Sequence, residues 1–75
     1  MEKSSIERVI VTVDDEHLEG IDSVAAALRV AGMQVTEILS TVGIISGQAP
    51  QECRQKLESV RGVKAVESDG EMRAI

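Results

Sequence analysis

Strand-like and helix-like runs alternate along this chain in an order that is compatible with few folds. The first run, "RVIVTV" over residues 8–13, is rich in β-branched residues and predicts a mostly buried strand. An amphipathic helix is expected next, because apolar residues then recur every three or four positions and share one helical face. These residues are Leu18, Ile21, Val24, Ala25 and Leu28. Gly32 suits the left-handed turn that ends a helix, and Gly20 inside this helix costs about 1 kcal/mol relative to alanine.

The middle of the chain predicts a β-hairpin. Residues 34–39, "QVTEIL", and 42–48, "VGIISGQ", read as two strands joined by a short turn near Ser40 and Thr41. Pro50 follows at a position where the first turn of a helix tolerates proline.

A second helix and a last strand complete the pattern. Cys53, Leu57 and Val60 form an apolar helical stripe that Gly62 ends. Residues 63–68, "VKAVES", then supply a fourth strand.

The order strand, helix, strand, strand, helix, strand consists of two strand-helix-strand halves. We therefore predict an α+β, ferredoxin-like βαββαβ fold with one antiparallel sheet in the strand order 4-1-3-2 and both helices on one face. No linker rich in Pro, Gly or Ser separates the halves, so residues 1–75 are expected to form a single domain.

Aliphatic residues alone must build the core, because none of the 75 residues is aromatic. A chain of this length buries only about 60% of the surface that its unfolded form exposes. Neighbouring apolar residues, such as Val9 and Ile10 or Ile44 and Ile45, point to opposite faces of a sheet. We expect some apolar surface on the face without helices, and hence a partner surface or self-association through the sheet into a homo-oligomer.

Composition argues against several classes of partner. The formal net charge of −5 and the lack of aromatic rings do not suit nucleic-acid binding. No apolar run is long enough to span a membrane, and "MEKSSIERV" lacks the apolar stretch of a secretory signal, so a cytoplasmic location is expected. The one cysteine excludes an internal disulfide and the paired cysteines of zinc sites.

An acidic cluster holds residue types that bind metals: Asp14, Asp15, Glu16, His17 and Glu19. Acids at the start of a helix are favoured by capping and by the helix dipole alone. His17 also lacks a second histidine or a cysteine to complete a ligand set. We therefore expect Asp14 or Asp15 to act as a helix cap, and we expect no metal and no cofactor.

Nucleophilic side chains suggest no enzyme. Cys53 lies on the apolar stripe of the second helix, where cysteine acts as a small hydrophobic residue. A Schiff base on Lys3, Lys56 or Lys64 would need a desolvated pocket, so no catalytic residue is assigned. Gly43 and Gly47 match no phosphate-binding loop and indicate a bulge, a bend or a close approach.

The segment "GIISGQAPQECRQKLESVRGVKAVESDGEM" resembles the second half of the subtilisin propeptide-like family of peptidase inhibitors. In that family, a strand, a helix ending in Gly and a "GV-x-x-VE-x-D" strand follow one another. The first half, "RVIVTVDDEHLEGIDSVAAALRVAGMQV", is similar in pattern. The resemblance implies the same topology and a bare sheet face that packs on a subtilisin-like serine protease.

The resemblance also implies a role for the C-terminal tail, which in that family lies in the active-site cleft of the protease as a product-like strand. Ile75 would then lie next to the catalytic serine, and Met72 would occupy an apolar subsite. The residues implied to bind the partner are Gly70, Glu71, Met72, Arg73, Ala74 and Ile75.

Short chains of this kind also resemble proteins labelled as ketohydroxyglutarate aldolases. Such an aldolase resembles a barrel of about 200 residues or more, so we expect no such activity here. The sequence therefore predicts a non-enzymatic protein-binding module that resembles a protease propeptide, inhibitor or folding helper. The alternative is a small regulatory ferredoxin-like domain that dimerises through its sheet and binds a small molecule at the interface.

Overall fold

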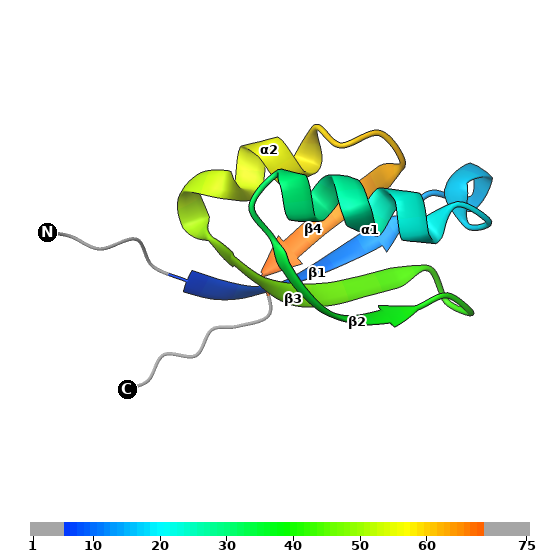
Figure 1. The fold of residues 1–75 in the computed structure, drawn as a ribbon, viewed down its shortest axis with the longest axis horizontal. Coiled ribbons are helices and arrows are strands. Elements are labelled where there is room, and N and C mark those ends of the chain that lie inside the picture. The colour runs from blue at the N-terminus through cyan, green and yellow to red at the C-terminus, as the bar shows by residue number, and fades with distance from the viewer. Residues whose placement is uncertain (1–5, 69–75) are drawn as a thin grey trace, which may run out of the picture.

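A computed structural model describes residues 6–68 (Figure 1). The strands are β1 (Ile6–Val13), β2 (Gln34–Leu39), β3 (Ile44–Pro50) and β4 (Val63–Ser68). The helices are α1 (Ile21–Val30) and α2 (Arg54–Glu58), and each is preceded by a short 3-10 turn, η1 (Asp15–His17) and η2 (Gln51–Cys53).

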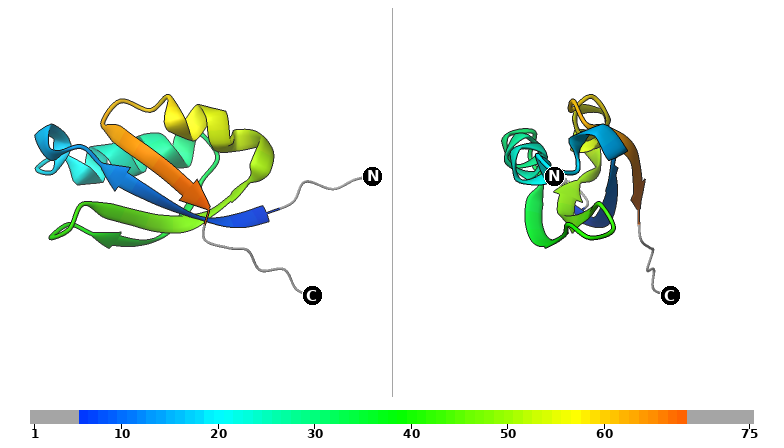
Figure 2. Two further views of the ribbon diagram at one scale, coloured as in Figure 1. Left: turned by 180° about the vertical axis from the view of Figure 1, so that it is seen from behind. Right: turned by 90° about the vertical axis from the view of Figure 1, so that its right-hand side faces the viewer.

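The four strands form one antiparallel sheet in the order β2-β3-β1-β4. This order confirms the predicted ferredoxin-like βαββαβ topology, and β1 pairs with β3 on one side and with β4 on the other. Both helices lie on the same side of the sheet (Figures 1 and 2). β2 and β4 are therefore the two edges, and no helix within residues 6–68 covers the other face of the sheet.

The core lies between the helices and the sheet and is entirely aliphatic. Val9, Val11 and Val13 face it from β1, since alternate residues of a strand point to the same side. Leu28 of α1, Ile45 of β3 and Leu57 of α2 are its largest fully buried side chains. The remaining buried members are Ile21, Val24, Ala25, Met33, Ala49 and Val66.

The first helix begins later than the sequence pattern predicts. Asp14 caps the 3-10 turn η1, and α1 starts only at Ile21 with Gly20 as its N-cap. Gly20 therefore precedes the helix instead of lying inside it. Leu18 falls between the two elements and still packs against the core, which explains why its spacing resembles that of a helical residue.

The third strand and the second helix also begin a few residues later than the sequence pattern predicts. β3 runs from Ile44 to Pro50, because residues 40–43 form the turn of the hairpin. Pro50 ends β3 in an extended conformation and caps η2, so it does not lie in the first turn of a helix. α2 keeps only five residues, and Cys53 precedes it.

Glycines allow the tight connections between these elements. Gly32 and Gly62 have φ angles of +112° and +96°, as expected for the left-handed turns that follow the helices. Gly47 has a different role, because a Cβ atom there would collide with the backbone carbonyl oxygen of Gln34. The neighbouring strand β2 carries an irregularity between Val35 and Glu37, next to this close approach.

We expect the substitution Gly47→Ala to lower the free energy of unfolding by about 1–3 kcal/mol, because β2 must move away to admit the methyl group. Urea denaturation measures this change. Gly20→Ala is the matched control, since its Cβ would meet nothing closer than the His17 carbonyl oxygen at 3.9 Å. The control should change stability by less than about 1 kcal/mol. Equal stability of the two variants would contradict the close approach.

Candidate functional site

The bare sheet face carries a row of three apolar side chains and one threonine across all four strands. Leu39 lies opposite Ile44, Ile44 opposite Thr12, and Thr12 opposite Ala65. Directly paired residues share one face of a sheet, so these four side chains form a single row. Leu39 is 40% exposed, and the other three are half-buried although no described helix covers this face.

A second row beside it has an apolar centre and acidic ends. It runs from Glu37 through Ser46 and Ile10 to Glu67. Ile10 is half-buried, and both carboxylates are exposed at the rim. We call these two rows the bare face; its members are Leu39, Ile44, Thr12, Ala65, Glu37, Ser46, Ile10 and Glu67. The expectation that neighbouring residues point to opposite faces is confirmed, because Val9 and Ile45 are buried in the core whereas Ile10 and Ile44 lie on the bare face.

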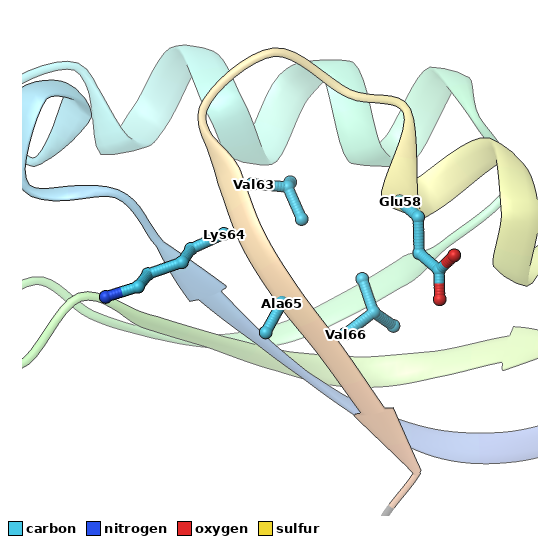
Figure 3. A pocket seen from close by; sticks show the side chains of 5 residues that line it. All are labelled: Glu58, Val63, Lys64, Ala65 and Val66. Atoms are coloured by element: carbon cyan, nitrogen blue, oxygen red, sulfur yellow. The ribbon is translucent and has the colours of Figure 1, made fainter.

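A second surface lies at the free edge of β4. An open pocket of about 350 Å³ is lined there by Glu58, Val63, Lys64, Ala65 and Val66. Val63 and Val66 extend toward Glu58 at the end of α2, whereas Lys64 and Ala65 extend to the other side of the strand (Figure 3).

Arg54 connects α2 to this edge. Its Nη2 donates a hydrogen bond of 3.1 Å to the carbonyl oxygen of Val66, and its Nε lies 3.5 Å from Oε2 of Glu58. The sequence reasoning did not single out Arg54 or Glu58. Only the predicted strand order, which makes β4 an edge, pointed to this region.

The acidic cluster forms a turn. Asp14 Oδ1 accepts a hydrogen bond of 3.2 Å from the backbone N–H of Glu16, as expected of a cap. His17 Nδ1 lies 3.8 Å from Asp14 Oδ2 and is buried without a hydrogen-bond partner. The His17 ring packs beside Gly62, where an added Cβ would come within 3.0 Å of Cγ. Residues 6–68 contain no group of three His, Cys, Asp or Glu side chains that could hold a metal ion.

The nucleophilic side chains lie in separate places. Cys53 is half-buried and packs against the turn after α1, where a Cβ added at Gly32 would lie 2.7 Å from Sγ. Cys53 therefore packs against Gly32, and it is not a member of the central core cluster. Lys64 lines the β4 pocket and Lys56 lies exposed on α2, whereas Lys3 falls outside the described residues.

The predicted partner-binding tail falls outside the part of the chain that the structure describes. This holds for Gly70, Glu71, Met72, Arg73, Ala74 and Ile75. β4 ends at Ser68, whose hydroxyl donates a hydrogen bond to the Glu7 carboxylate of the neighbouring strand β1. The last described strand is thereby held to the centre of the sheet at its C-terminal end.

Comparisons with protein families, with curated proteins and with solved structures found no match to this chain. Within residues 6–68, no helix is long and apolar enough to cross a membrane.

Two substitutions at Asp14 separate a cap from a metal ligand. Asp14→Ala removes the acceptor for the Glu16 N–H and should lower the free energy of unfolding by about 0.5–1 kcal/mol. Asp14→Asn keeps an acceptor oxygen, so it should lower the free energy of unfolding by less than half as much as Asp14→Ala. Chemical denaturation, with and without a chelator, measures both. A loss in Asp14→Asn as large as in Asp14→Ala, or destabilisation by the chelator, would contradict the capping role.

Proposed function

We propose that this protein is a non-enzymatic protein-binding module that docks its bare face on a subtilisin-like serine protease. The observation that carries the proposal is the bare face itself. Its two rows are apolar at Ile10, Ile44 and Ala65, and carboxylates lie at the ends of the second row. Arg8 precedes Ile10 on the same side of β1 and adds a positive charge next to these rows. An apolar centre with a polar rim is the usual composition of a protein–protein interface.

The kind of partner rests on the resemblance to propeptide-like inhibitors. The βαββαβ topology, with both helices on one face, leaves the opposite face free for such a partner. Seven positions of the sequence, 69–75, follow the end of β4.

The absence of an assigned catalytic group is consistent with this role. Cys53 lies against the turn at Gly32, His17 lies beside Gly62, and Lys64 lies at the edge of β4. These three side chains lie on three different elements, η2, η1 and β4, and the proposal includes no nucleophile paired with a base.

A second candidate function is a small regulatory domain that binds a small molecule. The observation that favours it is the pocket of about 350 Å³ beside β4, which has a volume within the range of small-molecule sites. Its side chains combine the apolar Val63 and Val66 with the charged Glu58 and Lys64. A bound metabolite would raise the melting temperature of the wild-type protein, and Lys64→Ala would reduce this effect if the ligand were an anion.

Inhibition of a subtilisin-like protease tests the leading proposal. Ile44→Lys places a charge at the apolar centre of the bare face and should raise the inhibition constant at least about tenfold, which is about 1.4 kcal/mol. Val30→Lys is the matched control, because Val30 is 89% exposed on α1 and lies outside the bare face. It should leave inhibition unchanged.

Deletion of residues 71–75 tests the tail in the same assay. The tail supplies backbone hydrogen bonds and side chains to the cleft in the proposed complex, so its loss should also raise the inhibition constant at least about tenfold. The domain should stay folded, as circular dichroism would show. A full-length protein that does not slow the protease at about 1 mM would overturn the proposal.

A further inference from the structure

The backbone of β4 offers a row of outward-facing polar groups at its free edge. Val13 N–H donates to Gly43 on the β3 side, and Asp14 N–H donates to Gly62 on the β4 side, at 2.8 Å in both cases. Backbone groups of a strand alternate in direction, so Ile10 and Thr12 face β4, and their partners Glu67 and Ala65 face β1. Val66 and Ser68 therefore face away from the sheet.

The hydrogen bond from Arg54 agrees with this direction, because a side chain of α2 reaches the Val66 carbonyl from outside the sheet. A carbonyl oxygen has two lone pairs, so Val66 can accept a second hydrogen bond while Arg54 stays in place. Arg54 thus uses one of the two acceptor positions of the Val66 carbonyl.

The two edge strands differ in where their backbone is irregular. β2 carries an irregularity between Val35 and Glu37, and the Thr36 hydroxyl donates back to the Ser46 carbonyl of β3. Irregularities and charged side chains are common protections of edge strands against pairing. β4 has a register shift only at its start, opposite Thr12 and Val13, and is regular from Ala65 to Ser68.

We propose that a second copy of this chain pairs antiparallel with the free edge of β4, around a twofold axis through Val66. Val66 then lies opposite the partner's Val66, so the outward N–H and C=O groups of the two residues bond to each other. The two sheets join into one of eight strands.

Charge complementarity argues for a second copy as the occupant. In this register Ala65 lies opposite the partner's Glu67, and Lys64 extends to the same side of the strand as Ala65 (Figure 3). Each Lys64 therefore lies beside the partner's Glu67, and the symmetry creates this attraction twice. Lys64 and Glu67 are both exposed in the single chain, so pairing does not disturb its core.

Face-to-face dimers bring carboxylates of the second row together. The bare face has a carboxylate at each end of its second row, Glu37 on β2 and Glu67 on β4. A twofold axis along the strands places Glu37 over the partner's Glu67, and an axis along that row places Glu37 over the partner's Glu37. Both arrangements oppose like charges in a chain of net charge −5. The edge dimer is proposed from the outward backbone groups of Val66 and the pairing of Lys64 with the partner's Glu67, and it is independent of which of the two proposed functions holds.

Charge reversal with rescue tests the inference, with sedimentation equilibrium of the full chain at up to about 1 mM as the measurement. The wild-type protein should dimerise in this range. Lys64→Glu and Glu67→Lys should each raise the dissociation constant at least about tenfold, or about 1.4 kcal/mol. The double variant restores opposite charges across the axis and should return to within about threefold of wild type.

Lys56→Glu is the matched control for the change in net charge. Lys56 lies two residues from Arg54 on α2, which places it about 200° around the helix from the side that reaches β4. This variant should dimerise like the wild type. A wild-type protein that stays monomeric at about 1 mM, single reversals without effect, or a double variant that is not rescued would overturn the edge dimer. A dimer lost in Ile44→Lys and kept in Lys64→Glu would place self-association on the bare face instead.

Discussion

The pairing of β1 with strands on both of its sides is the interaction on which the rest of the fold depends. β1 is the only described strand that contributes three buried valines, Val9, Val11 and Val13. Its backbone groups are divided between β3 and β4, as the bonds from Val13 and Asp14 show. Because β1 lies in the interior of the sheet, the later strands must add outside it, and β2 and β4 become edges.

An aliphatic core makes this arrangement sensitive to close packing. Without aromatic rings, burial comes from many small side chains, and the layers must approach closely to exclude voids. Two glycines show this proximity: Gly47 of β3 lies against the Gln34 backbone, and Gly62 lies against Val24 and the His17 ring. At each of these positions a Cβ atom would push apart elements that the core requires in contact.

Most of the fold could be predicted from the sequence, because the runs of β-branched residues form strands and glycines end the helices, as their local preferences indicate. The bounds of β2 and β4 match their patterns at every residue. The mismatch at β3 has a physical cause: Val42 has high strand propensity but lies 64% exposed in the hairpin turn. Leu18 was wrongly assigned to the first helix for a similar reason. It packs against the core, as a helical residue at this spacing would, but it lies between η1 and α1.

The two candidate surfaces also differ in how much of each could be predicted from the sequence. Alternation along a strand was enough to predict that Val9 and Ile10, and Ile44 and Ile45, point to opposite faces, but not which member of each pair lies on the bare face. The bond between Arg54 and Val66 was not predictable, because it depends on the rotation of a five-residue helix over a neighbouring strand. No local periodicity encodes that rotation, which is fixed by the packing of Leu57 in the core.

Face and edge are perpendicular directions of one sheet, so one surface can be occupied without covering the other. Side chains such as Ile10 and Ile44 form the face, whereas the backbone of Val66 forms the edge. A twofold axis through Val66 that is perpendicular to the sheet keeps each face on its own side. In the proposed dimer both bare faces point in the same direction and form one doubled surface. Glu67 is the residue where the two surfaces meet, because its side chain lies on the bare face and its strand is the edge.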